Sequence, residues 1–82
     1  RVFLCYPNPT QGTVHLSYEL TQGETAIWQI HDLRGQILES VQLDQARTEH
    51  TLSLANWPSG YYLGRIVLND ATLKTFRIVK IQ

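Results

Sequence analysis

The 82-residue chain has a single cysteine, no methionine and no excess of charge of either sign. One cysteine, Cys5, excludes an internal disulfide, and its place in an apolar run indicates a small core residue rather than a reactive thiol. Seven acidic residues balance seven basic ones, so no net field attracts nucleic acid. No apolar run approaches the roughly 18 residues of a transmembrane helix. These absences predict a small domain with no nucleic-acid partner and no membrane span.

Helical periodicity is also missing, whereas period-two alternation recurs along the chain. It predicts strands over residues 1–6, 13–20, 26–31, 36–43, 49–54, 61–68 and 73–81. Apart from Arg65, the run 61–68 is apolar on both faces, which predicts a central strand. Glu39 interrupts the apolar face of 36–43, which indicates an edge strand or a bulge. The irregular parity of the last run indicates burial on both faces or a bulge.

Turn residues separate the strands at short intervals. Pro7, Asn8 and Pro9 end the first strand, and Gly12 is expected to supply the free backbone that returns the chain to a sheet. Residues 21–24 and 69–72 are expected to close hairpins, and Asp32 and Gly35 to frame a tight turn. About seven strands without a helix predict an all-β fold, an antiparallel immunoglobulin-like β-sandwich in one domain over residues 1–82. A small barrel is the alternative.

Catalytic and metal-binding patterns are not evident. His15, His31 and His50 have no second ligand at a spacing that would preorganise a metal site, so no metal or other cofactor is expected. Asp32 and Asp70 lie in turns, where aspartate caps its own backbone. The serines lack a glycine-framed elbow or a neighbouring base. No catalytic residue is therefore assigned, and the chain is not expected to be an enzyme.

Aromatic residues keep a binding role open. Parity places Trp28 and Tyr62 in the core, whereas Trp57 and Tyr61 are free to form a flat platform for sugar rings. A carbohydrate-binding or adhesion module is therefore an alternative function. A structural spacer packed on a neighbouring domain is another, and it would need a large apolar patch on an outer sheet face.

Four motifs in order resemble the C-terminal sorting domain (type A) of the type IX secretion system of Gram-negative bacteria. The motifs are Tyr6-Pro7-Asn8-Pro9-Thr10-Gln11-Gly12, Ile30-His31-Asp32-Leu33-Arg34-Gly35, Trp57-Pro58-Ser59-Gly60-Tyr61-Tyr62 and Lys74-Thr75-Phe76-Arg77-Ile78-Val79-Lys80. Each motif is weak alone, but their order and spacing cover nearly the whole chain. Departures are Trp57 in place of a small aliphatic residue, His31 in place of an aromatic one, Arg77 in place of lysine, and the extra Gln82.

The resemblance implies a non-catalytic secretion signal at the end of a longer secreted protein. An N-terminal cargo domain of the same chain would enter the periplasm, and the type IX translocon would then carry it across the outer membrane. A cell-surface sortase would commonly remove the signal and attach the parent to the surface. The abrupt start of the sequence, without methionine, agrees with a fragment of such a protein. The sequence leaves open whether two copies form a dimer.

The resemblance also suggests which residues matter. The turns that match the family are Pro7, Asn8, Pro9, Gly12, Asp32, Gly35, Gly60 and Tyr62. The expected recognition residues are Lys74, Arg77, Ile78, Val79 and Lys80, since no acid follows Asp70 and the last segment is basic. An exposed last hairpin could add to a partner sheet through main-chain hydrogen bonds.

Overall fold

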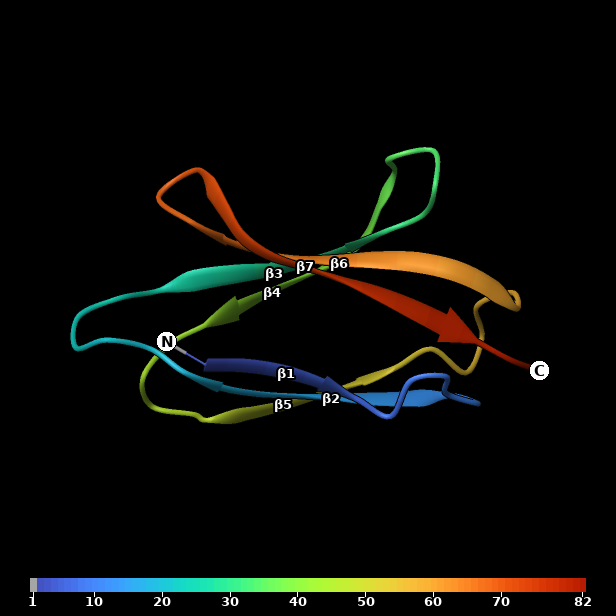
Figure 1. Ribbon diagram of the computed structural model, residues 1–82, viewed down its shortest axis with the longest axis horizontal. Helices are drawn as coiled ribbons and strands as arrows, with labels where there is room; N and C mark the ends of the chain where they lie inside the picture. Colours follow the sequence, from blue (N-terminus) through green and yellow to red (C-terminus); the bar gives the residue numbers. More distant parts are fainter. Residues whose placement is uncertain (1) are drawn as a thin grey trace.

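The computed structural model describes residues 2–82, and these residues form two stacked antiparallel sheets (Figure 1). One sheet has the strand order β1-β2-β5 and the other has β4-β3-β6-β7. The strands are β1 (Val2–Tyr6), β2 (Thr13–Glu19), β3 (Ala26–His31), β4 (Ile37–Leu43), β5 (Glu49–Ser53), β6 (Gly60–Leu68) and β7 (Ala71–Lys80). The predicted immunoglobulin-like sandwich is confirmed. Within residues 2–82 no helix is long and apolar enough to cross a bilayer.

The connection after β2 differs from the prediction. Residues 21–24 do not close a hairpin, because β2 pairs with β1 and β5 whereas β3 pairs with β4 and β6. The segment instead carries the chain from one sheet to the other. Asn69 and Asp70 do close a two-residue hairpin, with φ of 52° and 63°, as a type I′ turn requires. The predicted second hairpin is therefore correct and shorter than expected.

The core lies between the sheets and follows the period-two pattern. Trp28 and Leu16 have no exposed surface, and Tyr62 is buried beside them in the same cluster. The opposite faces of the strands are partly solvated. In β6 the even-numbered residues from Tyr62 to Leu68 are buried and the odd-numbered ones are half-buried or exposed. β6 is therefore central in its sheet but covered on one face only.

Two strands contain a bulge. In β4, Ile30 faces Glu39 and His31 faces Ile37, which leaves Leu38 as an extra residue on this edge strand. In β7, Ile66 faces Lys74 and Val67 faces Thr72, which leaves Leu73 extra. Each extra residue reverses the inward and outward positions of its strand. The predicted bulges and the edge position of β4 are thus confirmed.

Candidate recognition surface on the terminal strand

The three cations of the last strand point in different directions. Arg77 is exposed on the outer face of its sheet, where its guanidinium lies 5.9 Å from the centre of the Tyr61 ring. Lys74 is exposed and lies on the side of β7 that also carries Phe76 and Ile78, with its ammonium 5.5 Å from the Phe76 ring. Ile78 is fully buried. The segment is therefore not one continuous basic face.

Lys80 is buried, with only 4% of its surface exposed. Its Nζ donates to the carbonyl of Trp57 at 2.9 Å and to the carbonyl of Gln82 at 2.9 Å. These bonds join the end of β7 to the turn that precedes β6. The expectation that Lys80 belongs to a solvated basic surface is therefore wrong, because the ammonium is used inside the fold.

The free edge of β7 is covered along its second half by residues 8–10, which we call the strap. The Asn8 side chain accepts from the Val79 amide at 2.9 Å and donates to the Arg77 carbonyl. Thr10 donates its amide to the Val79 carbonyl at 2.8 Å and accepts from the Ile81 amide at 2.9 Å. A side-chain amide and one residue of main chain thus replace a neighbouring strand. Residues 77–81 are consequently not available for pairing with a partner strand, contrary to the sequence-based expectation.

Thr10 was not singled out by the sequence, yet it organises the loop between β1 and β2. It is 3% exposed, and its hydroxyl donates to the Thr13 carbonyl and accepts from the amides of Gly12 and Thr13. A threonine that caps amides two and three residues ahead is a known turn signal, which could have identified it. Gly12 is not among the glycines with positive φ, so the free backbone expected there is not used.

The turn between β3 and β4 confirms the role expected for Asp32. Its Oδ1 accepts from the amides of Arg34 at 2.9 Å and Gln36 at 3.0 Å, and Gly35 adopts a φ of 91°. Partial desolvation acts in the opposite direction, but the donors of Gln36 and Arg34 together lower the pKa of Asp32. This aspartate caps a turn and takes no part in a carboxylate pair.

The turn before β6 is fastened by Tyr62. Its hydroxyl donates to the Pro58 carbonyl four residues upstream, which is the arrangement of a tyrosine corner. Gly60 adopts a φ of 148°, which a β-branched residue would resist. Trp57 is half-buried, and its ring centre lies 5.2 Å from that of Tyr62. The motif residues Gly60 and Tyr62 therefore shape the turn that also receives Lys80.

The aromatic platform needed by a carbohydrate-binding module is not formed. Trp57 packs against the core, and the exposed Tyr61 is flanked by the Arg77 guanidinium. The two rings therefore do not offer a shared flat surface for a sugar ring.

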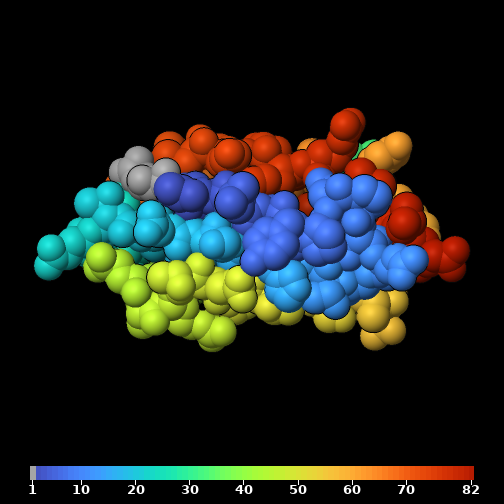
Figure 2. All heavy atoms as spheres, turned by 60° about the horizontal axis from the view of Figure 1, so that its bottom comes forward, coloured from blue at the N-terminus to red at the C-terminus, as the bar shows by residue number. Residues whose placement is uncertain are grey.

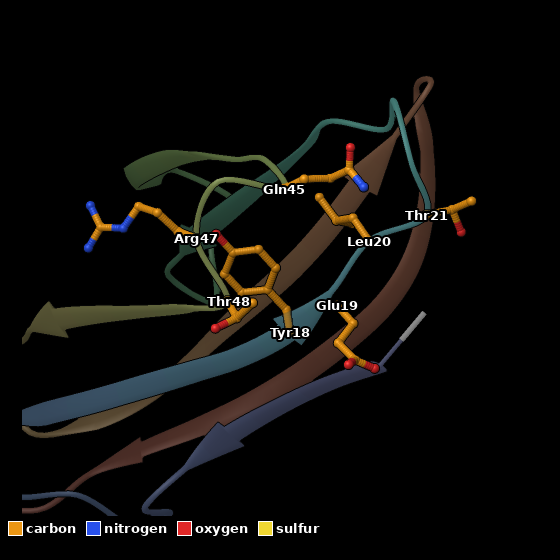
Figure 3. A pocket seen from close by; sticks show the side chains of 7 residues that line it. All are labelled: Tyr18, Glu19, Leu20, Thr21, Gln45, Arg47 and Thr48. Carbon is orange, nitrogen blue, oxygen red and sulfur yellow. The ribbon is translucent and has the colours of Figure 1, made fainter.

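A hollow of about 410 Å³ lies at the far end of the sandwich, between the connections that follow β2 and β4 (Figure 3). The side chains of Arg47 and Glu19 point away from each other there, so charged groups do not converge on a ligand. Tyr18, at its floor, is buried, and desolvation raises its pKa. Among residues 2–82, no three His, Cys, Asp or Glu side chains are grouped to hold a metal ion.

Comparison with known proteins agrees with the motifs. No curated protein matches the chain significantly. Residues 4–81 match the family described as the secretion system C-terminal sorting domain. The matched range includes all four motifs. Because the match covers nearly the entire sequence, this chain belongs to the family of C-terminal sorting domains of the type IX secretion system.

Proposed function

We propose that this domain acts as a non-catalytic export address that is read on the exposed part of β7. Family membership gives it the role of a C-terminal type IX sorting signal on a secreted or cell-surface parent. The parent reaches the translocon through the periplasm, and a surface sortase then removes the domain and attaches the cargo.

The observation that carries the proposal is the exposure of Lys74 and Arg77 on an edge strand. β7 is the outer strand of its sheet. Lys74 lies on the half that the strap leaves open, and Arg77 is an exposed residue at the point where the strap begins. A cation on an exposed edge orients a partner by charge, whereas Ile78 and Lys80 support the strand from inside. Val79 is half-buried and bonded to the strap.

The test is the export of a secreted reporter that carries this chain at its C-terminus. Arg77→Glu should leave the domain folded and retain the reporter in the periplasm, because it reverses an exposed charge. Arg47→Glu is the matched control, since Arg47 is exposed at the opposite end of the sandwich. Surface delivery of the Arg77→Glu fusion in normal amount would contradict the proposal. Deletion of residues 73–82 is a poor test, because it removes Ile78 from the core.

A further inference from the structure

An apolar groove of about 560 Å³ separates β1 from the first half of β7. Its lining comes from Val2, Phe3, Leu4, Leu73 and Lys74. Val2 is 48% exposed and Leu4 59%, although both are large apolar side chains in a strand. Figure 2 shows β1, in dark blue, lying against the orange-red start of β7 on the same face of the molecule. This face therefore exposes apolar surface from both sheets at one place.

Both strands that border the groove are edges with unpaired main-chain groups. The Tyr18 amide donates to the Thr48 carbonyl at 2.8 Å, so the main-chain groups of Tyr18 point away from β1. Phe3 pairs with Tyr18 in the antiparallel ladder. The amide and carbonyl of Phe3 therefore point away from β2. The amide and carbonyl of Val79 point away from β6, toward the strap. Main-chain groups alternate in direction along a strand, so those of Thr75, four residues earlier, also point away from β6. Thr75 lies beyond the end of the strap. Neither Phe3 nor Thr75 has a main-chain partner on that side among residues 2–82.

The spacing of a sandwich suits one inserted strand. Packed sheets lie about 10 Å apart, which is about twice the distance between paired strands. An extended segment in the groove can therefore bond to one edge while its side chains cover the apolar lining. The strap already does this at residues 77–81, where Thr10 forms a parallel bridge with Lys80. The groove continues the same edge in the direction of the β6–β7 hairpin.

Lys74 determines the charge of the segment that fits. It is the one charged residue in the lining, and among residues 2–82 it forms no ion pair. Its ammonium instead lies 5.5 Å from the centre of the Phe76 ring. A segment that carries a carboxylate beside its apolar side chains would pair with this exposed charge while its other side chains cover the groove.

We propose that the groove between β1 and β7 accepts an extended segment of a partner protein, apolar on its inner face and carrying one acidic residue that meets Lys74. The segment pairs with the open edge at Thr75 and continues the row of bonds that the strap begins. That the partner belongs to the export machinery rests on the proposed function; the strand-accepting groove itself rests on the geometry alone.

A synthetic peptide of about eight residues, an ordinary strand length, tests the groove. Valine alternates with threonine in the probe, and one inward valine is replaced by aspartate. Titration of the ¹⁵N-labelled chain should shift the amides of Phe3, Cys5, Thr75 and Arg77. The same peptide with lysine in place of aspartate should bind about tenfold more weakly at low salt, and added salt should reduce the difference.

Three variants connect binding to the groove. Thr75→Pro removes an outward amide without removing an internal bond of the sheet, as an edge strand tolerates. Leu73→Glu places a carboxylate in the lining, and Leu33→Glu is its matched control on a turn residue that is 68% exposed. The first two should weaken the peptide about tenfold or more, and the control should not. Chain folding is checked by the dispersion of the remaining amide signals.

Several results would overturn the proposal. The groove would not be a strand acceptor if the peptide shifted amides elsewhere in the chain, or if it shifted none at its solubility limit. The same would follow if the folded Thr75→Pro variant bound the peptide as tightly as the unmodified chain. A concentration-dependent dimer that is lost in Thr75→Pro would make a second copy the occupant instead. Reporter export separates this proposal from the proposed function. If the Arg77→Glu fusion is retained in the periplasm but the unmodified chain does not bind the peptide, the groove proposal alone is overturned. If the unmodified chain binds the peptide but the Arg77→Glu fusion is exported normally, the export role alone is overturned.

Discussion

The side-chain amide of Asn8 pairs with the main chain of Val79, 71 residues further along the chain. With the bond from Asn8 to the Arg77 carbonyl, this contact makes one side chain act as a short piece of strand. It joins the first and the last of the family motifs. The edge of β7 is thereby divided into a half that the domain covers itself and a half that remains open.

Asn8→Ala should reduce the free energy of unfolding by about 1–2 kcal/mol, because two hydrogen bonds are lost and the freed groups become solvated. Amide hydrogen exchange at Val79 should accelerate more than exchange at Thr10. Asn56→Ala, at an exposed loop position, is the matched control and should change neither quantity. Unchanged exchange at Val79 would show that the strap does not depend on Asn8.

Lys80→Met should lower stability by about 1–2 kcal/mol, because the Trp57 carbonyl loses its donor while the apolar stem is kept. Lys80→Ala should cost more, since it also leaves a cavity beside Ile78. Chemical denaturation measures both, followed by the combined fluorescence of Trp28 and Trp57. Lys74→Met is the control, because Lys74 is exposed and should be nearly neutral. Equal, negligible effects of all three changes would contradict a supporting role for Lys80.

Gly64→Ala should destabilise the domain by about 1–3 kcal/mol through overpacking. An added Cβ would lie 2.9 Å from Nε1 of Trp28 and 3.3 Å from Cδ1 of Ile78, both fully buried. Gly12→Ala provides the comparison, since its Cβ would meet nothing closer than 3.9 Å. Thermal unfolding should show a lower melting temperature for the first variant and little change for the second. A larger loss of melting temperature for Gly12→Ala than for Gly64→Ala would contradict this prediction. It would mean that the core repacks around the added methyl group whereas the loop does not accommodate it.

Asp32 should make stability depend on pH in the acid range. Its pKa is lowered in the folded state, so its contribution is complete above the unfolded pKa of about 3.9 and is lost as the pH falls through the folded pKa. Titration of the carboxyl by NMR should show the lowered pKa directly. Asp32→Asn keeps an acceptor but cannot ionise, so its unfolding midpoint should fall less steeply below about pH 4. A normal Asp32 titration in the folded chain would contradict the capping argument.

Most strands were predictable because each has one face toward solvent and one face toward the core. The pattern Val14, Leu16, Tyr18 has the same parity in the sequence and in the core. The turns at Asp32 and Asn69 were predictable because their residue types favour the required backbone. The recognition roles assigned to Lys74, Arg77, Ile78, Val79 and Lys80 remain predictions.

The sequence alone determined the local alternation and the turn chemistry. These gave about seven strands, most of their inward residues and the family to which the order of motifs belongs. Only the tertiary structure decided which strands share a sheet, that Lys80 points inward and that Asn8 covers the edge of β7. Periodicity states which side chains share a face, but it contains no information on partners distant in the chain. The Trp57 carbonyl that receives Lys80 is 23 residues away, and that contact exists only once both sheets have packed.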